Sequence, residues 1–269
     1  EAEQLGADDS QRTAAPTALS FEALGQRFDL VLEVNDRVVN ALPADAESNG
    51  ISVYRGRVAN NPDSWVRIVM FEGMPRGLVW DGETMFAIEA PGDSAADISE
   101  PVMYRLSDLN IVPGTMTCGT TAMGGNAAQY LTSVKGELET IAEAPGATSE
   151  ITMSVIGDSA FTARQGGDAA AVAAITARFN NIDGYFSEQV GVQLNVDLIE
   201  THDAASDPFD PATTDPSALL TELSEYRLQI SAHSSRGLTH LYTGRDVTGM
   251  TVGLAWLGTV CEDYFGAGL

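Results

Sequence analysis

Two neighbouring runs decide how the C-terminal half of this chain folds: Leu241-Tyr242-Thr243-Gly244-Arg245-Asp246 and Thr251-Val252-Gly253-Leu254-Ala255-Trp256-Leu257-Gly258-Thr259-Val260-Cys261. The first run predicts a strand near 239–242 that ends in a turn over Gly244–Gly249, because glycine adopts the backbone angles that tight turns need. The second run predicts an extended segment over 251–260. A turn is therefore expected to join two extended pieces of chain here.

The sequence that leads into these runs alternates predicted strands and helices. Residues 151–158 and 192–199 are predicted strands. The stretch 168–190 predicts a helix, because five apolar residues are spaced 3, 4, 3 and 4 apart: Val172, Ile175, Phe179, Ile182 and Phe186. A second amphipathic helix is predicted over 219–230. We therefore expect an α/β unit over 149–269, with a twisted mixed sheet and two helices.

The first half of the chain has the period-two pattern of half-buried strands. Alternating apolar residues predict strands over 28–34, 51–58 and 65–71. Asp81-Gly82 lies between two further apolar runs and is typical of a hairpin turn. These features predict a mostly antiparallel β-rich domain over 25–105, so that the whole chain is of the α+β class.

Two regions lack such a pattern. Residues 1–24 are mostly polar and rich in alanine, and we expect a loose leader there. Residues 106–148 are rich in glycine, threonine and alanine with few aromatic residues, and we expect a connector on the protein surface. The chain begins at Glu1 without a signal sequence, so a secretion signal is expected to have been removed or left out.

Charge and cysteine content exclude several classes of protein. The formal net charge is −24, from 38 acidic and 14 basic residues. Nucleic acids and anionic membranes both require a basic face, so neither is an expected partner. No apolar run approaches the roughly 20 residues that a membrane-spanning helix needs. Two cysteines do not make a disulfide scaffold, although Cys118 and Cys261 could bridge each other.

Motifs in both halves resemble those of reprolysin (adamalysin-type, metzincin) zinc metalloproteases. The run Val155-Ile156-Gly157-Asp158, the helix around 179–186 and the two opening runs resemble the N-terminal part of the catalytic domain. Segments of the first half resemble the β core of the family's propeptide: 54–58, 61–64, 76–79 and 83–89. The resemblance implies a secreted zymogen, extracellular or periplasmic, in which a propeptide precedes an incomplete catalytic domain over 149–269.

The zinc-binding motif of that family is absent from residues 1–269. The family binds zinc through H-E-x-x-H-x-x-G-x-x-H on a helix, and His202, His233 and His240 have no such spacing. The resemblance implies that the parent protein hydrolyses peptide bonds with a zinc-activated water. We expect no zinc site and no peptidase activity in this chain alone. The implied partners are a peptide or protein substrate and the remaining part of the catalytic domain.

The resemblance also assigns candidate site residues to the second run. An edge strand over 251–258 can pair with an extended peptide through its free backbone groups. Val252, Gly253, Leu254 and Ala255 would then bind the substrate. The alternative is a non-catalytic inhibitory or protein-binding module that uses the β-rich domain and this same edge strand.

Cys118 is the candidate inhibitory switch. Reprolysin zymogens often carry a Cys-Gly pair here, and its thiolate occupies the open position on zinc. Cys118 would therefore be a metal ligand in the intact zymogen. The usual preceding Pro-Lys is absent and Pro113 lies further upstream, so a bystander thiol or half of a disulfide is the alternative. Cys261 resembles a family cysteine whose partner lies further along the catalytic domain.

Overall fold

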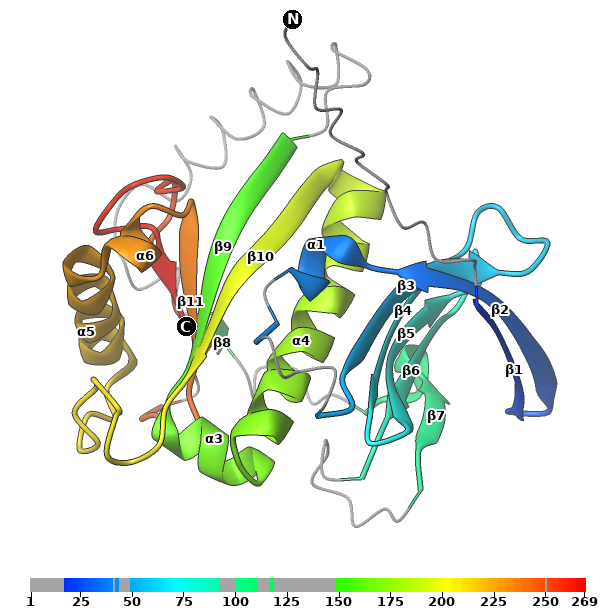
Figure 1. Cartoon of the computed structure of the whole chain (residues 1–269), viewed down its shortest axis with the longest axis horizontal. Helices are drawn as coiled ribbons and strands as arrows, with labels where there is room; N and C mark the ends of the chain where they lie inside the picture. Colours follow the sequence, from blue (N-terminus) through cyan, green and yellow to red (C-terminus); the bar gives the residue numbers. More distant parts are fainter. Residues whose placement is uncertain are drawn as a thin grey trace, which may run out of the picture.

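The computed structural model describes residues 17–40, 42–43, 49–91, 100–110, 117–118, 149–249 and 251–269. Two β-sheets face each other across the long helix α4 (Asp168–Tyr185), and a second helix, α5 (Pro216–Gln229), covers the far face of the C-terminal sheet (Figure 1). The expected α+β class is therefore confirmed. None of the helices in the described ranges is both long and apolar enough to cross a membrane.

The N-terminal sheet is an antiparallel meander whose seven strands are hydrogen-bonded in chain order. Its strands are β1 (Thr17–Ala23), β2 (Gln26–Val34), β3 (Ser52–Val58), β4 (Trp65–Phe71), β5 (Met74–Trp80), β6 (Met85–Glu89) and β7 (Val102–Arg105). The short helix α1 (Asp36–Val39) follows β2, and the 3-10 turn η1 (Leu106–Asp108) follows β7. The predicted strands and the Asp81-Gly82 hairpin are thus confirmed.

The predicted leader over 1–24 is wrong at its C-terminal end, because residues 17–23 form strand β1. Leu19 and Phe21 pack against the apolar cluster of the N-terminal sheet, and the Phe21 ring stacks on Phe28 at 5.3 Å. Leu19, Phe21 and Ala23 alternate with polar or exposed residues, and this pattern indicates a strand although the segment is polar overall. Residues 1–16 of the predicted leader lie outside the described residues.

The C-terminal unit is built on a sheet with strand order β10-β9-β11-β13. Its elements are β9 (Ser149–Gly157), α3 (Ser159–Gln165), α4, the π-helical turn η3 (Phe186–Val190), β10 (Val192–Thr201), α5, α6 (Ser231–Ser234), β11 (Leu238–Tyr242), β12 (Thr251–Gly253) and β13 (Ala267–Gly268). The predicted strands and both long helices are confirmed. The four strands are all parallel, and the antiparallel part of the expected mixed sheet is limited to a bridge between Ala255 and Gly268.

Helix α3 was not predicted, although its two ends are signalled in the sequence. The Asp158 carboxylate accepts a hydrogen bond of 2.7 Å from the Phe161 backbone N–H, which is the usual role of an N-cap aspartate. Gly166 ends the helix in the left-handed conformation. These caps enclose a helix too short to show an apolar period.

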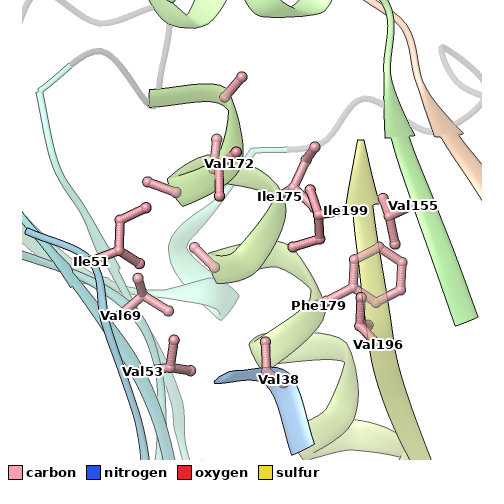
Figure 2. Packing of buried hydrophobic residues seen from close by; sticks show 14 of the residues in the cluster. Val38, Ile51, Val53, Val69, Val155, Val172, Ile175, Phe179, Val196 and Ile199 are labelled. Atoms are coloured by element: carbon pink, nitrogen blue, oxygen red, sulfur yellow. The ribbon is translucent and has the colours of Figure 1, made fainter. Parts of the chain in front are cut away.

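The two halves of the chain share one hydrophobic core. Strand β4 is buried on both faces: Val66 and Ile68 pack within the N-terminal sheet, while Val69 and Phe71 pack toward α4. Figure 2 shows residues of the N-terminal sheet on one side of α4 and residues of β9 and β10 on the other. The two predicted domains therefore do not have separate hydrophobic cores.

Candidate functional site

The edge of the C-terminal sheet is formed by residues 251–256. The backbone N–H and C=O of Leu254 both pair with Leu269, at 2.9 and 2.8 Å, which attaches this segment to the end of β13. Successive backbone groups of an extended chain point in opposite directions. Gly253 therefore directs its backbone groups away from β13, toward the outer edge.

The four predicted substrate residues do not share one environment. Val252 is 65% exposed, whereas Leu254 is 3% exposed and packs beneath α5. Ala255 forms the bridge to Gly268. Gly253 and Val252 thus lie where an added peptide would pair, while the side chain and backbone of Leu254 are used by the fold. The prediction that Leu254 lines the cleft therefore lacks support from its position.

The predicted extended segment ends earlier than residue 260. After Trp256 the chain turns, with positive φ at Gly258 and Cys261, and Phe265 returns to pack edge-on against the Trp256 ring at 5.1 Å. Arg227 of α5 holds this return, because its buried guanidinium donates to the Glu262 carbonyl at 3.3 Å. The usable edge is thus residues 251–256.

The run Thr243-Gly244-Arg245 anchors the start of the edge. The buried Asp158 carboxylate accepts hydrogen bonds from the Thr243 hydroxyl at 2.5 Å and the Gly244 N–H at 3.0 Å, and it pairs with Arg245 at 3.1 Å. A Cβ atom on Gly244 would lie 2.3 Å from the backbone of Ala160. The motif therefore fixes the turn before the edge strand and leaves no space for a side chain at Gly244.

Cys118 lies at this edge. The backbone of strand β8 (Thr117–Cys118) pairs in parallel with β12, with Thr117 opposite Thr251 and Cys118 opposite Gly253. The segment that bears the candidate switch is therefore beside the candidate peptide-binding edge. The rest of the connector from 119 to 148 lies outside the described residues. Cys261 is a free, exposed cysteine.

A comparison with protein families finds a match, which covers the C-terminal unit. Residues 147–269 match the family model Reprolysin_5, Metallo-peptidase family M12. This C-terminal part of the chain is therefore similar to the reprolysin-type metallopeptidases. The match begins just before β9 and covers the whole C-terminal sheet with its edge. No curated protein matches the chain.

Residues 147–269 contain three histidines, none of them in the spacing with which the family binds zinc. Within the described ranges, no three His, Cys, Asp or Glu side chains are grouped as metal ligands. His202 and His233 both direct Nε2 toward the Glu200 carboxylate, at 3.3 and 2.8 Å, and the His233 hydrogen bond is the main cause that lowers the pKa of Glu200. His233 is therefore engaged in a hydrogen bond with Glu200, and His202 lies beside the same carboxylate.

The free energy of unfolding should depend on pH because of His240, a residue of strand β11. Burial beside Tyr242 and Phe179 lowers its pKa to about 4. Between pH 6.5 and 4 the unfolded chain binds a proton at this ring and the folded chain does not, so stability falls as the pH falls through that window. Because His240 is only partly buried, we expect a loss of about 2 kcal/mol.

The measurement compares wild type with His240→Gln in urea unfolding at pH 7.5, 5.5 and 4.5. The variant removes the titrating group, so its free energy of unfolding should fall less steeply on acidification. Equal slopes for the two proteins would show that His240 is not buried in its neutral form.

Proposed function

We propose that this chain is the propeptide and the front part of the catalytic domain of a secreted zinc metalloendopeptidase. The observation that carries the proposal is the pairing of residues 117–118 with the edge strand β12. Strand β12 lies within the segment that matches the reprolysin family model. In this arrangement the propeptide occupies the backbone groups that a peptide substrate would use. The parent enzyme cleaves peptide bonds with a zinc-activated water, bound by the family motif that residues 1–269 lack.

In this proposal, residues of this chain position and block the substrate and do not carry out the chemistry. Gly253 and Val252 offer the edge to which an extended peptide adds. The Asp158–Arg245 pair and the Arg227 contacts hold the two ends of that edge in place. Residues 1–269 alone should not hydrolyse peptides, and they should not retain zinc after dialysis against a chelator.

The alternative is a non-catalytic module that recruits another protein through the edge strand. Such a module needs an edge that is free to pair. The pairing of 117–118 with Gly253 favours inhibition from within the chain over recruitment of a separate partner.

The test is Cys118→Ala in a protein that extends through the zinc motif. If the thiolate blocks zinc, loss of the thiol should raise peptidase activity before propeptide removal by about tenfold or more, because a strong ligand leaves the fourth zinc position. Thr120→Ala is the matched control, since it changes a nearby residue of the same connector, keeps the thiol and should not change latency. Equal activity of Cys118→Ala and wild type would exclude the thiol switch.

A further inference from the structure

Residues 17–105 contact the C-terminal unit through a surface distinct from the edge strand. Val53 and Val69 of the N-terminal sheet pack on α4, and α1 packs against β10 (Figure 2). Strand β10 lies at one side of the sheet, and the segment 254–256 lies beyond β13 at the other. Three strand spacings of about 4.8 Å separate β10 from β13, so the two contacts are roughly 15 Å or more apart.

A buried charge network joins the two halves at this surface. Asp183 of α4 is completely buried, and its Oδ2 atom accepts from Arg37 at 2.7 Å and from Arg67 at 3.1 Å. Beside it, the Asn35 amide donates to the Asn180 side chain at 2.8 Å. Asn180 in turn donates to the backbone carbonyls of Tyr54 at 3.0 Å and Ile68 at 3.3 Å, so hydrogen bonds cross the contact in both directions. Each half therefore satisfies buried polar groups that the other half would otherwise leave unpaired.

Close packing adjoins this network. The Trp65 ring contacts Tyr185 edge-on, with 5.4 Å between ring centroids. A Cβ atom on Gly184 would lie 2.7 Å from Trp65 Cζ3 and 3.0 Å from Arg67 Cγ. The helix thus approaches β4 so closely that only glycine fits at position 184. Apolar packing, paired buried charges and close approach are the features of a stable protein interface.

We propose that residues 17–105 remain bound to α4 after the connector is cut, so that cleavage between 119 and 148 does not by itself release strand 117–118 from the edge. Residues 109–116 join η1 to β8 and can span at most about 28 Å. So short a tether keeps 117–118 at an effective concentration in the millimolar range near β12. Release then requires a second step that opens the α4 contact. The expectation that the cut protein stays inactive rests on the proposed function, whereas the binding of residues 17–105 to α4 does not.

The sequence allows a direct test, because Lys135 is the only lysine in the chain and it lies in the connector. A lysine-specific endoproteinase should cut the full chain once, into residues 1–135 and 136–269. We expect both fragments to elute from a sizing column in one peak, at the volume of the intact chain, at low micromolar concentration. Elution in two separate peaks would overturn the proposal. If Lys135 resists cleavage, a site-specific protease sequence inserted after it delivers the same cut.

A wedge variant tests whether α4 is the surface responsible. Gly184→Leu places a side chain against Trp65 while improving the helix propensity of α4, so its cut fragments should separate. Glu225→Leu is the matched control, because it adds the same residue to an exposed position of α5 and should leave one peak. Co-elution of the Gly184→Leu fragments would overturn the role of α4.

A second variant covers the case in which Gly184→Leu does not fold. Arg37→Ala should lower the urea concentration at which the cut fragments separate, and an unchanged value would count against the proposal. Both readouts are independent of the Cys118 experiment. Separation of the fragments would therefore leave the proposed function standing, and unchanged latency in Cys118→Ala would leave this interface standing.

Discussion

Asp183→Ala should lower the free energy of unfolding of the intact chain by about 3–5 kcal/mol, because it removes the buried carboxylate that pairs with both Arg37 and Arg67 and leaves Arg67 only Glu188 at 3.4 Å. The Arg67 side chain is 3% exposed, and its Nε donates to Asp183 at 3.1 Å. Burial lowers the pKa of Arg67, and the Asp183 charge opposes that change. Without the carboxylate, Arg67 must stay charged in a site from which water is excluded, or the sheet must move away from α4.

Urea unfolding at pH 7 measures this loss, followed by tryptophan fluorescence because Trp65 lies at the interface. Asp246→Ala is the matched control: its carboxylate also pairs with an arginine, Arg164, at 2.7 Å, but the Asp246 side chain is 96% exposed. Water replaces such a surface pair at little cost, so the control should unfold near the wild-type midpoint. Similar midpoints for both variants would mean that Asp183 is not a buried counter-charge.

Arg227→Met should destabilise the chain by a similar amount, about 3–5 kcal/mol, for a different reason. Arg227 is fully buried, and its guanidinium donates to the carbonyls of His233 and Arg236 and to the Thr239 hydroxyl, each at 2.6 Å. Methionine keeps the length of the side chain but donates no hydrogen bond. Several buried acceptors then lose their partner together.

The loss should also be local, because Arg227 reaches the Glu262 carbonyl in the turn that follows the edge strand. Hydrogen exchange of residues 257–266 should therefore accelerate in Arg227→Met beyond the change expected from global stability. Arg105→Met is the matched control, since that side chain is 42% exposed and makes a loose surface pair with Asp108 at 3.7 Å. If 257–266 exchanges at the wild-type rate in Arg227→Met, this arginine does not hold the turn.

Local sequence patterns are sufficient to predict where most strands and helices lie. Period-two alternation placed β2, β3 and β4, and the Asp81-Gly82 turn placed the β5–β6 hairpin. The 3, 4 spacing placed α4, because burial on one side of a helix repeats every 3.6 residues. These signals are local, since each depends on residues a few positions apart. The prediction failed for strand β1, where the polar composition of residues 1–24 outweighed the apolar alternation, and for helix α3, which is too short to show an apolar period.

The contacts between segments that are distant in the sequence are seen only in the tertiary structure. Asp183 lies in a polar stretch of α4, and in a chain of net charge −24 such a residue would be expected on a solvent-exposed face. Its arginine partners lie 116 and 146 residues away in the sequence. Thr117 and Cys118 meet β12 across more than a hundred residues, although nothing in their own residue types specifies that pairing. Long-range pairing depends on the complementary shape and charge of whole surfaces, which form only when both sheets and α4 have folded.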